Sequence, residues 1–321
     1  MEPAVDRSTI WPYVDGEPGP FHYARDGHPV GVEAERALGE LEGGEALLFP
    51  SGMGAATAVV LALLEPGQTI ALAQDAYYGT GVLLDELERW GLRHVLFDQT
   101  GPPPADVDLV WVEAPSNPFL TMPDLEAAAA HPALVLCDAT AATPINLRPL
   151  EHGCDLVLHS ATKYLGGHHD VLLGAVVAKR PDHAARLHEF RTRSGIVAAP
   201  DAAWLLLRGL QTLEARVRRQ GETAAGLASR IGRHDRTSDV RYPGFGGLVS
   251  FDVASGEAAR RVEMATRLIV NATSLGGVVS TMESRYRWEG ARVPEGLLRL
   301  SVGLEPVDAL WSDLEQALEQ G

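Results

Sequence analysis

The stretch "DLVLHSATKYLGGHHD" (residues 155–170) joins a short apolar run to a lysine, two hydroxyl side chains and a pair of glycines. The run Leu156–Leu158 has the composition of a buried strand, and Lys163 follows shortly after it. In an open α/β sheet, ligands gather at the carboxyl ends of the strands. A lysine there can form a Schiff base with an aldehyde cofactor, which no other side chain does. A lysine in a surface turn gives the same pattern, so both interpretations stay open from this stretch alone.

The composition limits the classes of protein that the chain can belong to. Its 321 residues suggest about two domains, and its formal net charge of -16 repels nucleic-acid phosphates, so we expect no nucleic-acid partner. The longest apolar run, Ala55–Leu64, is too short to cross a bilayer, and the N-terminus lacks a signal-peptide pattern. We therefore expect no membrane association and a cytoplasmic location. Cys137 and Cys154 lie in apolar surroundings, which predicts buried free thiols.

Short apolar runs alternate with helical patterns over the first two hundred residues. The runs are almost wholly apolar, as in strands that are covered on both faces. This alternation predicts an α/β architecture with a mostly parallel, seven-stranded sheet. The predicted strands are Ala46–Phe49, Thr69–Ala73, His94–Phe97, Leu109–Val112, Leu134–Cys137, Leu156–Leu158 and Gly174–Ala178.

The pattern changes after about residue 200, where strands become fewer and helices longer. We predict a long helix over Trp204–Arg219, a strand over Leu248–Val253 and a helix over Glu257–Val270. The stretch "LLRLSVG" (297–303) alternates and places Arg299 on the face opposite the leucines, where a cleft can lie. A solvent-facing arginine on an edge strand is the alternative. The predicted organisation is an N-terminal arm over 1–42, a large domain over 43–200 and a smaller C-terminal α/β domain over 201–321.

A second buried run ends in an acidic residue. In "VLCDATAATP" (135–144), Asp138 follows apolar residues directly, and a carboxylate in such a place needs a partner. The pyridinium nitrogen of pyridoxal phosphate (PLP) is one such partner, since the ion pair keeps the nitrogen protonated and makes the ring an electron sink. Asp after a strand is also a common turn or cap residue, so this interpretation depends on the other motifs.

Three further motifs follow predicted strands. In "LFPSGMGAATAVV", Gly52 and Met53 open a helix, and the backbone N–H groups at such a place can bind phosphate. Tyr77 in "QDAYYGT" can stack on a planar ring, and Asn117 in "VEAPSNP" can donate to a phenolate oxygen. Each motif has a plainer explanation: a steric turn, a core tyrosine or an Asn-Pro turn.

Taken together, the motifs "SATKYLGGH", "CDATAATP", "PSGMGAA", "DAYYGT", "EAPSNP" and "LLRLSVGLE" resemble one family. It is the transsulfuration (Cys/Met metabolism) family of fold-type I PLP enzymes, which includes cystathionine γ-synthase, cystathionine lyases and methionine γ-lyase. The resemblance runs from about Tyr23 to the C-terminus, with the six motifs in the same order. It implies a fold-type I PLP transferase architecture, PLP as cofactor and a small amino-acid substrate.

The resemblance also implies roles for individual residues. Lys163 matches the lysine that forms the aldimine with PLP and also moves protons, and Asp138 matches the partner of the pyridinium nitrogen. Tyr77 matches the tyrosine that stacks on the ring and is credited as a general acid or base. The phosphate is expected to be bound by Gly52, Met53, Ser160 and Thr162.

Substrate and subunit contacts follow from the same resemblance. Arg299 matches the arginine that binds the substrate α-carboxylate, a two-pronged task that suits a guanidinium. Ser274 and Asn117 are expected beside the substrate. Tyr23 and Arg25 resemble a pair that reaches the phosphate of a neighbouring subunit, which implies at least a homodimer and leaves a tetramer open. The adjacent histidines at 168 and 169 lack ligand spacing, so we expect no metal site.

The sequence departs from the family around the substrate entrance. Gly79 stands where methionine γ-lyases carry a cysteine, which weighs against that activity. Thr273 stands where relatives carry a glutamate that binds the distal ammonium of cystathionine. The segment 283–296 replaces the family's "HPASMTH" loop and contains Arg285, Arg287 and Arg292. These cations either meet an acidic substrate or balance an acidic surface, and the second is the commoner case.

The sequence therefore predicts a PLP-dependent carbon–sulfur lyase, similar to cystathionine γ-lyase, that acts by β- or γ-elimination on a sulfur-containing or O-activated amino acid through Lys163. The nearest alternative is a γ-replacement enzyme of the cystathionine γ-synthase or O-acylhomoserine sulfhydrylase type. An aminotransferase on the same fold type, and a protein that binds the cofactor without turnover, are further alternatives.

Overall fold

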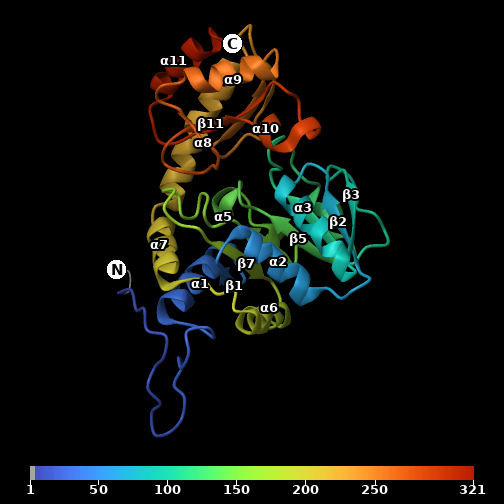
Figure 1. The fold of residues 1–321 in the computed structure, drawn as a ribbon, viewed down its shortest axis with the longest axis vertical. Helices are drawn as coiled ribbons and strands as arrows, with labels where there is room; N and C mark the ends of the chain where they lie inside the picture. The colour runs from blue at the N-terminus through green and yellow to red at the C-terminus, as the bar shows by residue number, and fades with distance from the viewer. Residues whose placement is uncertain (1–3) are drawn as a thin grey trace.

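The computed structural model describes residues 4–321 of the chain. Two sheets with their helices are stacked along the long axis of the molecule, and the chain's N-terminal segment extends from one end (Figure 1). The larger sheet has seven strands in the order β1-β7-β6-β5-β4-β2-β3. These strands are β1 (Glu45–Phe49), β2 (Thr69–Ala73), β3 (Arg93–Phe97), β4 (Leu109–Glu113), β5 (Leu134–Asp138), β6 (Leu156–His159) and β7 (Gly174–Ala178).

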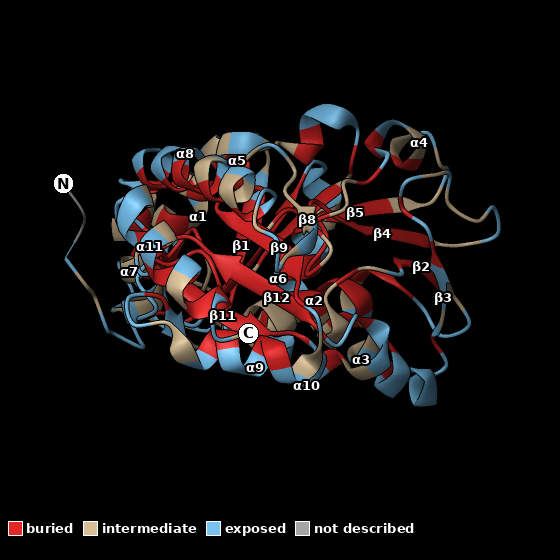
Figure 2. Cartoon of the chain, turned by 90° about the horizontal axis from the view of Figure 1, so that it is seen from above, coloured by how far each residue is buried: buried red, intermediate tan, exposed pale blue. Residues whose placement is uncertain are grey.

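The larger sheet is mostly parallel, as predicted. Strands β2 to β6 run parallel, whereas β7 is antiparallel to both of its neighbours, β1 and β6. Helices connect most of the parallel strands, a loop over 98–108 joins β3 to β4, and the sheet lies in the middle of its layers (Figures 1 and 2). The helices and 3₁₀ turns of this part are α1 (Pro29–Glu42), α2 (Gly52–Leu63), α3 (Tyr78–Leu87), η1 (Glu88–Trp90), α4 (Leu125–Ala129), α5 (Thr143–Asn146), η2 (Pro149–His152) and α6 (Pro181–Ser194).

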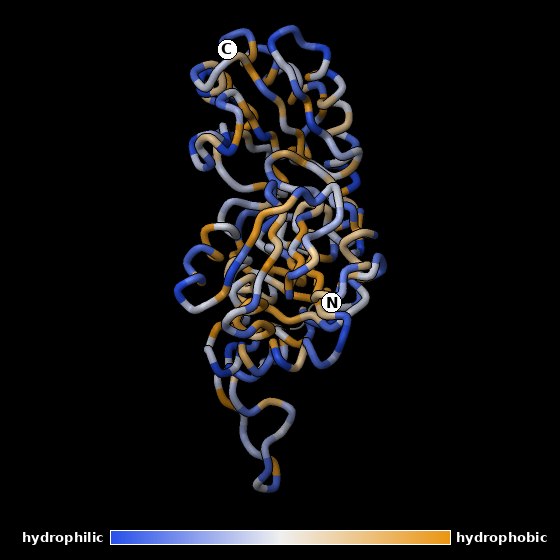
Figure 3. The backbone as a smooth tube through the Cα atoms, turned by 90° about the vertical axis from the view of Figure 1, so that its right-hand side faces the viewer, coloured by the Kyte–Doolittle hydropathy of each residue, from blue (hydrophilic) through white to orange (hydrophobic). Residues whose placement is uncertain are grey.

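Burial explains why these strands read as continuous apolar runs. Every residue of β4 and β7 is buried, because helices cover both faces of the sheet. Apolar stretches of backbone run through the interior of the molecule (Figure 3). Cys137 and Cys154 are buried and free, which confirms the prediction for the two thiols.

The N-terminal part of the chain divides at helix α1. Its first residue is Pro29, and the His28 side chain accepts a hydrogen bond from the Gly31 N–H at the helix start. The α1 side chains of Val30, Ala34 and Leu38 are fully buried in the core beside the larger sheet. Residues 4–28 instead form the extended segment that projects from the body in Figure 1. We call residues 4–28 the arm.

The smaller sheet has five strands in the order β10-β11-β12-β9-β8. One face of it packs on α8, α9 and α11 and forms a second hydrophobic core. None of the described helices is long and apolar enough to cross a membrane. The elements of this part are α7 (Pro200–Leu210), α8 (Leu213–Ile231), β8 (Ser238–Arg241), β9 (Leu248–Asp252), α9 (Gly256–Ala265), β10 (Val270–Asn271), β11 (Thr281–Ser284), α10 (Tyr286–Glu289), η3 (Gly290–Arg292), β12 (Leu297–Ser301) and α11 (Val307–Leu318).

The prediction of one helix over Trp204–Arg219 is wrong, because the chain breaks between α7 and α8. A Cβ atom at Gly209 would lie 2.3 Å from the carbonyl oxygen of Leu165, so the end of α7 touches the segment that follows Lys163. The Arg216 side chain then donates to the Gly209 and Tyr164 carbonyls at 2.7 and 2.8 Å. These tertiary bonds replace helical ones at the break.

The predicted helix over Glu257–Val270 also ends early, at Ala265. The carboxylate of Asp313 on α11 accepts hydrogen bonds from the backbone N–H groups of residues 267, 268 and 269, at 2.8 to 2.9 Å. Those groups therefore have no need of helical carbonyl partners. The chain turns there and continues into β10.

Candidate active site

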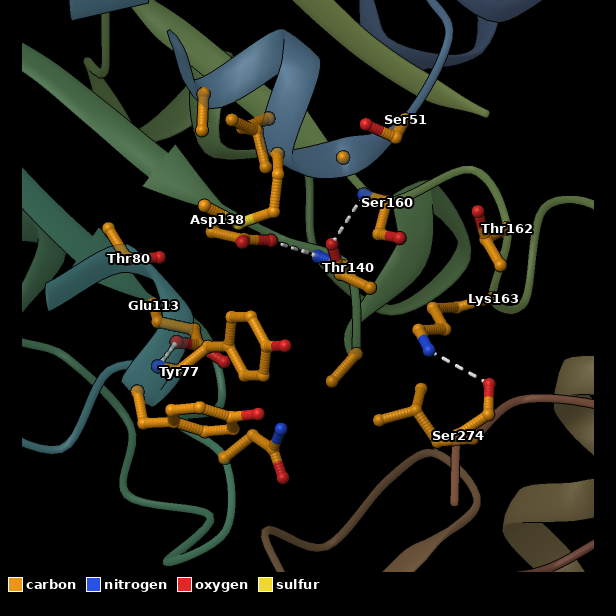
Figure 4. A pocket seen from close by; sticks show the side chains of 18 of the residues that line it. Ser51, Tyr77, Thr80, Glu113, Asp138, Thr140, Ser160, Thr162, Lys163 and Ser274 are labelled. Atoms are coloured by element: carbon orange, nitrogen blue, oxygen red, sulfur yellow. Dashed lines mark hydrogen bonds between the residues drawn. The ribbon is translucent and has the colours of Figure 1, made fainter. Parts of the chain in front are cut away.

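A cavity of about 400 Å³ lies at the carboxyl ends of the parallel strands, where the larger sheet meets the smaller one. Figure 4 shows it from close by. This edge of the sheet is where the predicted cofactor residues converge. The lining includes Gly52, Met53, Tyr77, Glu113, Asn117, Asp138, Ser160, Thr162 and Lys163 from the larger part, and Thr273, Ser274, Arg285, Trp288 and Arg299 from the smaller part.

Lys163 follows β6 and points into the cavity (Figure 4). Its Nζ atom donates a hydrogen bond to Ser274 Oγ at 2.8 Å. Burial, assisted by the nearby charge of Arg299, lowers the pKa of Lys163 to about 8. An amine with this pKa is partly neutral near physiological pH and can act as a nucleophile and a base.

Asp138 is the last residue of β5, and the strand register places it beside Glu113 of β4. Its Oδ1 atom accepts the Thr140 N–H at 2.9 Å. Burial raises the pKa of Asp138, although the Thr140 hydrogen bonds oppose that shift. A cationic ring nitrogen bound against this carboxylate would remove part of the cost of its burial.

Glu113 is a cavity residue that the sequence analysis missed. Its side chain is buried, and Oε2 accepts the backbone N–H of Tyr77 at 2.5 Å. Burial and the neighbouring Asp138 raise the pKa of Glu113 well above its usual range. Its position at the end of the run "LVWVE", directly after the predicted strand Leu109–Val112, could have identified it from the sequence. Glu113 fixes the start of the segment that carries Tyr77.

The expected phosphate site lies at the N-terminus of α2. Ser51 caps that helix, with its Oγ accepting the Gly54 N–H at 3.0 Å. A Cβ atom at Gly52 would lie 2.9 Å from Ser160 Cβ, so only glycine allows this close approach. The Thr162 hydroxyl donates to the Leu173 carbonyl at 3.1 Å, which engages its proton with the backbone. The structure thus brings Gly52, Met53 and Ser160 together, and it holds the Thr162 hydroxyl on Leu173.

Tyr77 follows β2, and its ring projects into the cavity (Figure 4). The rings of Tyr77 and Tyr78 lie 4.9 Å apart between centroids and are tilted by 58°. Burial raises the pKa of Tyr77, with a smaller effect from Tyr78. A Cβ atom at Gly79 would lie 2.5 Å from Tyr77 Cε1, so the glycine leaves room for the ring as it is placed here.

Arg299 on β12 reaches the cavity from the smaller sheet and is 3% exposed. It donates from Nη1 to Asn117 Oδ1 at 2.6 Å and from Nη2 to the Ser274 carbonyl at 2.9 Å. Burial lowers its pKa to about 10, so the side chain stays charged at neutral pH. Within residues 4–321, its buried Nε atom has no hydrogen-bond partner. A ligand carboxylate would satisfy that donor.

A second carboxylate, Glu283 on β11, was also missed; it contacts the cavity-lining side chains of Arg285, Trp288 and Arg299 without lining the cavity itself. Glu283 is 2% exposed and accepts hydrogen bonds from Thr273, Arg285, Trp288 and Arg299. The available signal was the replaced loop itself, which begins at this residue.

The three arginines of the replaced loop have different surroundings. Arg285 is 3% exposed and lines the cavity, so the explanation as a surface counter-charge is wrong for it. Arg287 pairs with Glu263 at 2.6 Å, and Arg292 donates to the Gln74 carbonyl at 3.1 Å. Only the first of the three faces the site.

Two pairs of residues that were discussed from the sequence do not line the cavity of their own chain. Tyr23 and Arg25 belong to the arm, where the guanidinium lies 5.1 Å from the tyrosine ring centroid. Arg25 also donates to the Thr192 carbonyl at 2.9 Å. Their reach into a neighbouring subunit stays a prediction. His168 and His169 are exposed and do not line the cavity.

Comparison with known proteins identifies the family of this site. The profile described as "Cys/Met metabolism PLP-dependent enzyme" matches residues 4–319. The chain belongs to that family. It is 41% identical to L-methionine gamma-lyase of Streptomyces avermitilis, over 98% of this chain and 83% of the relative. It is 37% identical to cystathionine gamma-synthase of Mycobacterium tuberculosis, over 95% of this chain and 88% of the relative.

Solved structures give the same result for the fold of this PLP-dependent enzyme. A crystal structure of cystathionine gamma-lyase from Micromonospora echinospora superposes with a TM-score of 0.94 and 34% identity, covering 99% of this chain and 94% of that one. The fold-type I architecture and the PLP dependence predicted from the sequence are confirmed. Family and relatives together make the chain a PLP-dependent lyase or synthase that acts by elimination or replacement.

The described cavity fits PLP on three counts. Gly52 and Ser160 approach closely at the helix terminus, as a phosphate cradle requires. Asp138 supplies a carboxylate to the cavity at the end of β5, and burial raises its pKa. Lys163 presents a partly neutral amine to the same cavity.

Proposed function

We propose that the enzyme is a carbon–sulfur lyase, which removes a β or γ substituent from a sulfur-containing or O-activated amino acid. Lys163 moves the protons, and Arg299 holds the α-carboxylate. The observation that carries this proposal is the shared contact with Ser274. Lys163 Nζ bonds the Ser274 hydroxyl at 2.8 Å, and Arg299 Nη2 bonds its carbonyl at 2.9 Å. One residue thus fixes the spacing between the amine and the carboxylate anchor.

The residues divide the chemistry between them. Bound PLP supplies an electron sink conjugated to the substrate α-carbon. Lys163 Nζ, with its pKa of about 8, removes the α-proton and holds it for later return. Tyr77 provides a hydroxyl beside the leaving group, and its raised pKa keeps it protonated as a donor at neutral pH. The Asp138 carboxylate stabilises positive charge at the ring nitrogen.

Substrate orientation follows from the neighbours of Arg299. Asn117 Oδ1 holds one end of the guanidinium at 2.6 Å, so the amide group can turn its nitrogen toward the ring of the cofactor. The Nε–H group of Arg299, which has no partner in residues 4–321, then donates a hydrogen bond to the substrate carboxylate.

A γ-replacement synthase is the second candidate, and the relatives named cystathionine gamma-synthase support it. It differs from the lyase in using a thiol to capture the intermediate fragment. Elimination ends in a keto acid and ammonia, whereas replacement releases the leaving group and ends in a new carbon–sulfur bond on an amino acid that keeps its amine: a thioether with cysteine, a thiol with sulfide. Mixtures of O-acylhomoserine with cysteine or sulfide therefore separate the two activities.

We further propose a homo-oligomer, at least dimeric, in which Tyr23 and Arg25 reach the neighbouring active site. The arm supports this proposal because it projects from the body and exposes Ile10, Tyr13 and Val14 by 69%, 61% and 67%. A cytoplasmic location is proposed on the two free, buried cysteines.

The test is a keto-acid and sulfide assay with cystathionine, cysteine, methionine and O-acylhomoserine, using Lys163→Ala as the control. The lyase proposal expects keto acid from at least one of them with the wild type, and none above background with the variant. Equal release by both proteins would contradict it. Conversion of an added keto acid with formation of pyridoxamine phosphate would identify an aminotransferase. Bound cofactor without any product would identify a protein that has lost turnover.

A further inference from the structure

We propose that Glu283 and Arg285 are positioning residues for the substrate carboxylate. Glu283 orients Arg299, and Arg285 offsets the negative charge of Glu283, so that the group of three keeps a net positive charge for the ligand of Arg299. The inference rests on the proposed function in one respect, the role of Arg299 as the carboxylate anchor. It assigns a task to the segment 283–296, in which the chain departs from its family.

Strand register places Glu283 directly opposite Arg299. The antiparallel strands β11 and β12 pair these two residues as cross-strand partners, so their side chains lie on the same face of the smaller sheet. Arg299 Nη2 donates to Glu283 Oε1 at 2.7 Å. This contact fixes the guanidinium on the side away from Asn117, which holds Nη1.

Arg285 bonds the same carboxylate oxygen from the start of the replaced segment. Its Nη1 atom donates to Glu283 Oε1 at 2.5 Å, and its Nε and Nη2 atoms donate to Glu289 at 3.0 and 2.8 Å. Both carboxylates and the Arg285 guanidinium have side chains that are 3% exposed. Hydrogen bonds to Glu283 and Glu289, two acidic residues of the same segment, therefore hold the Arg285 side chain in place.

The charges of the cluster explain why two arginines are needed. Glu283 alone against Arg299 would form a neutral buried pair, with little attraction left for another carboxylate. Arg285 shares Glu283, so the three groups together carry one positive charge. Glu289 lies on the far side of Arg285, and burial raises its pKa, which favours its neutral form. Thr273 and Trp288 donate to Glu283 as well and disperse its negative charge further.

The Nε–H group of Arg299 sets the direction from which a carboxylate can bind. Nη1 is occupied by Asn117, and Nη2 by Glu283 and the Ser274 carbonyl. The buried Nε–H is left without a partner in residues 4–321. A guanidinium held at both terminal nitrogens presents this edge in a fixed orientation, which suits a planar carboxylate.

The first experiment removes the positive charge of Arg285. We expect Arg285→Met to raise the apparent KM for the amino-acid substrate by about thirtyfold and to change kcat by less than about threefold. The dissociation constant of glycine, which has no β substituent to lose, should rise by a similar factor when followed by the absorbance of the bound cofactor. Arg285→Lys keeps the charge and should recover most of the affinity.

The second experiment removes the carboxylate as well. In Arg285→Met, the Glu283 carboxylate still contacts Arg299, but Arg285 no longer offsets its charge. The double variant Arg285→Met with Glu283→Gln therefore should bind glycine more tightly than Arg285→Met alone, by about fivefold or more. A purely structural role predicts the opposite, since a second disruption of the core would weaken binding further.

The matched control is Arg287→Met, which changes an arginine of the same segment that pairs with Glu263 and does not line the cavity. It should leave KM and glycine affinity within about twofold of the wild type. An unchanged glycine affinity in Arg285→Met, or a double variant that binds worse than the single one, would overturn the inference. Unaltered glycine affinity in Arg299→Met would instead contradict the anchor role in the proposed function. Inactivity of the wild type on all four substrates would contradict the lyase, whereas the glycine titration would still test Arg285.

Discussion

The floor and the rim of the cavity are held together in different ways. The floor consists of residues at the ends of parallel strands, such as Asp138 and Lys163, which backbone pairing places at one edge of the larger sheet. The rim consists of side chains from the smaller sheet and the segment 283–296, which buried ion pairs hold in place. Backbone pairing fixes the positions of the floor residues. The rim residues depend on buried ion pairs, which a single substitution can disrupt.

The largest effect is expected at the floor, from Lys163→Ala. Loss of the amine that moves the α-proton should lower kcat by at least about 10³-fold, measured as keto-acid release. The chain has one other lysine, Lys179, whose Nζ donates to the Leu150 carbonyl at 3.3 Å. Borohydride reduction of the wild type followed by peptide mass analysis should therefore label Lys163 alone. A label on Lys179 would contradict the assignment.

Asp138→Asn should have the next largest effect. An amide cannot stabilise a protonated ring nitrogen, so kcat should fall by about 10²-fold while the KM stays near the wild-type value. A steady-state comparison with Asp155→Asn, whose carboxylate accepts the Val135 N–H at the other end of β5, gives the control for general damage to the strand. Equal losses in the two variants would point to disturbed folding instead of a role at the cofactor.

Gly52→Ala tests the close approach at the phosphate end. The new Cβ atom would lie 2.9 Å from Ser160, and overpacking of this kind costs about 1–3 kcal/mol. The dissociation constant for PLP should therefore rise by roughly tenfold or more, as measured by fluorescence titration of the cofactor-free protein. Gly54→Ala in the same helical turn meets its nearest atom only at 3.3 Å and should bind PLP almost normally.

The smallest expected effect is on the pH profile of the reaction, which depends on Lys163 of the floor and on Arg299 of the rim. Lys163 acts as a base when it is neutral and free of the cofactor, as it is in the substrate complex, so kcat should rise about tenfold per pH unit below its pKa of about 8 and level off above it. Arg299 is one of the groups that lower this pKa. Arg299→Met should therefore shift the midpoint of the profile to higher pH. A midpoint that stays the same or moves to lower pH would show that the charge of Arg299 does not affect the pKa of Lys163.

The floor could be predicted from the sequence almost completely. Each predicted strand of the larger sheet was found within one residue at either end. Most of these strands are buried on both faces and leave an unbroken apolar signal, whereas the edge strand β3 is mostly exposed. Asp138 follows one such run directly, and Lys163 comes shortly after another. The structure brings both residues to one cavity. The roles given to them by the family resemblance stay predictions until the variants above are measured.

The rim could be predicted only in part. Arg299 was recognised through the family resemblance, which the alternation of its strand supports. Glu283 was not recognised, since its importance arises from a cross-strand partner sixteen positions away. Arg285 looked like a surface counter-charge, because sequence alone does not show that two acids bury it. The break before Leu213 was missed for the same reason, as the contact of Gly209 with Leu165 is tertiary.

The antiparallel register of β11 and β12 sets a rule for how this entrance can change over evolution. Side chains alternate between the two faces of a strand, so a slip of one position would send Glu283 to the opposite side of the sheet. Additions or losses in the connection after Arg285 leave that parity untouched. The connection beyond Glu289 can thus change in length without breaking the pairing of Glu283 with Arg299, whereas a shift within β11 or β12 would separate the two side chains.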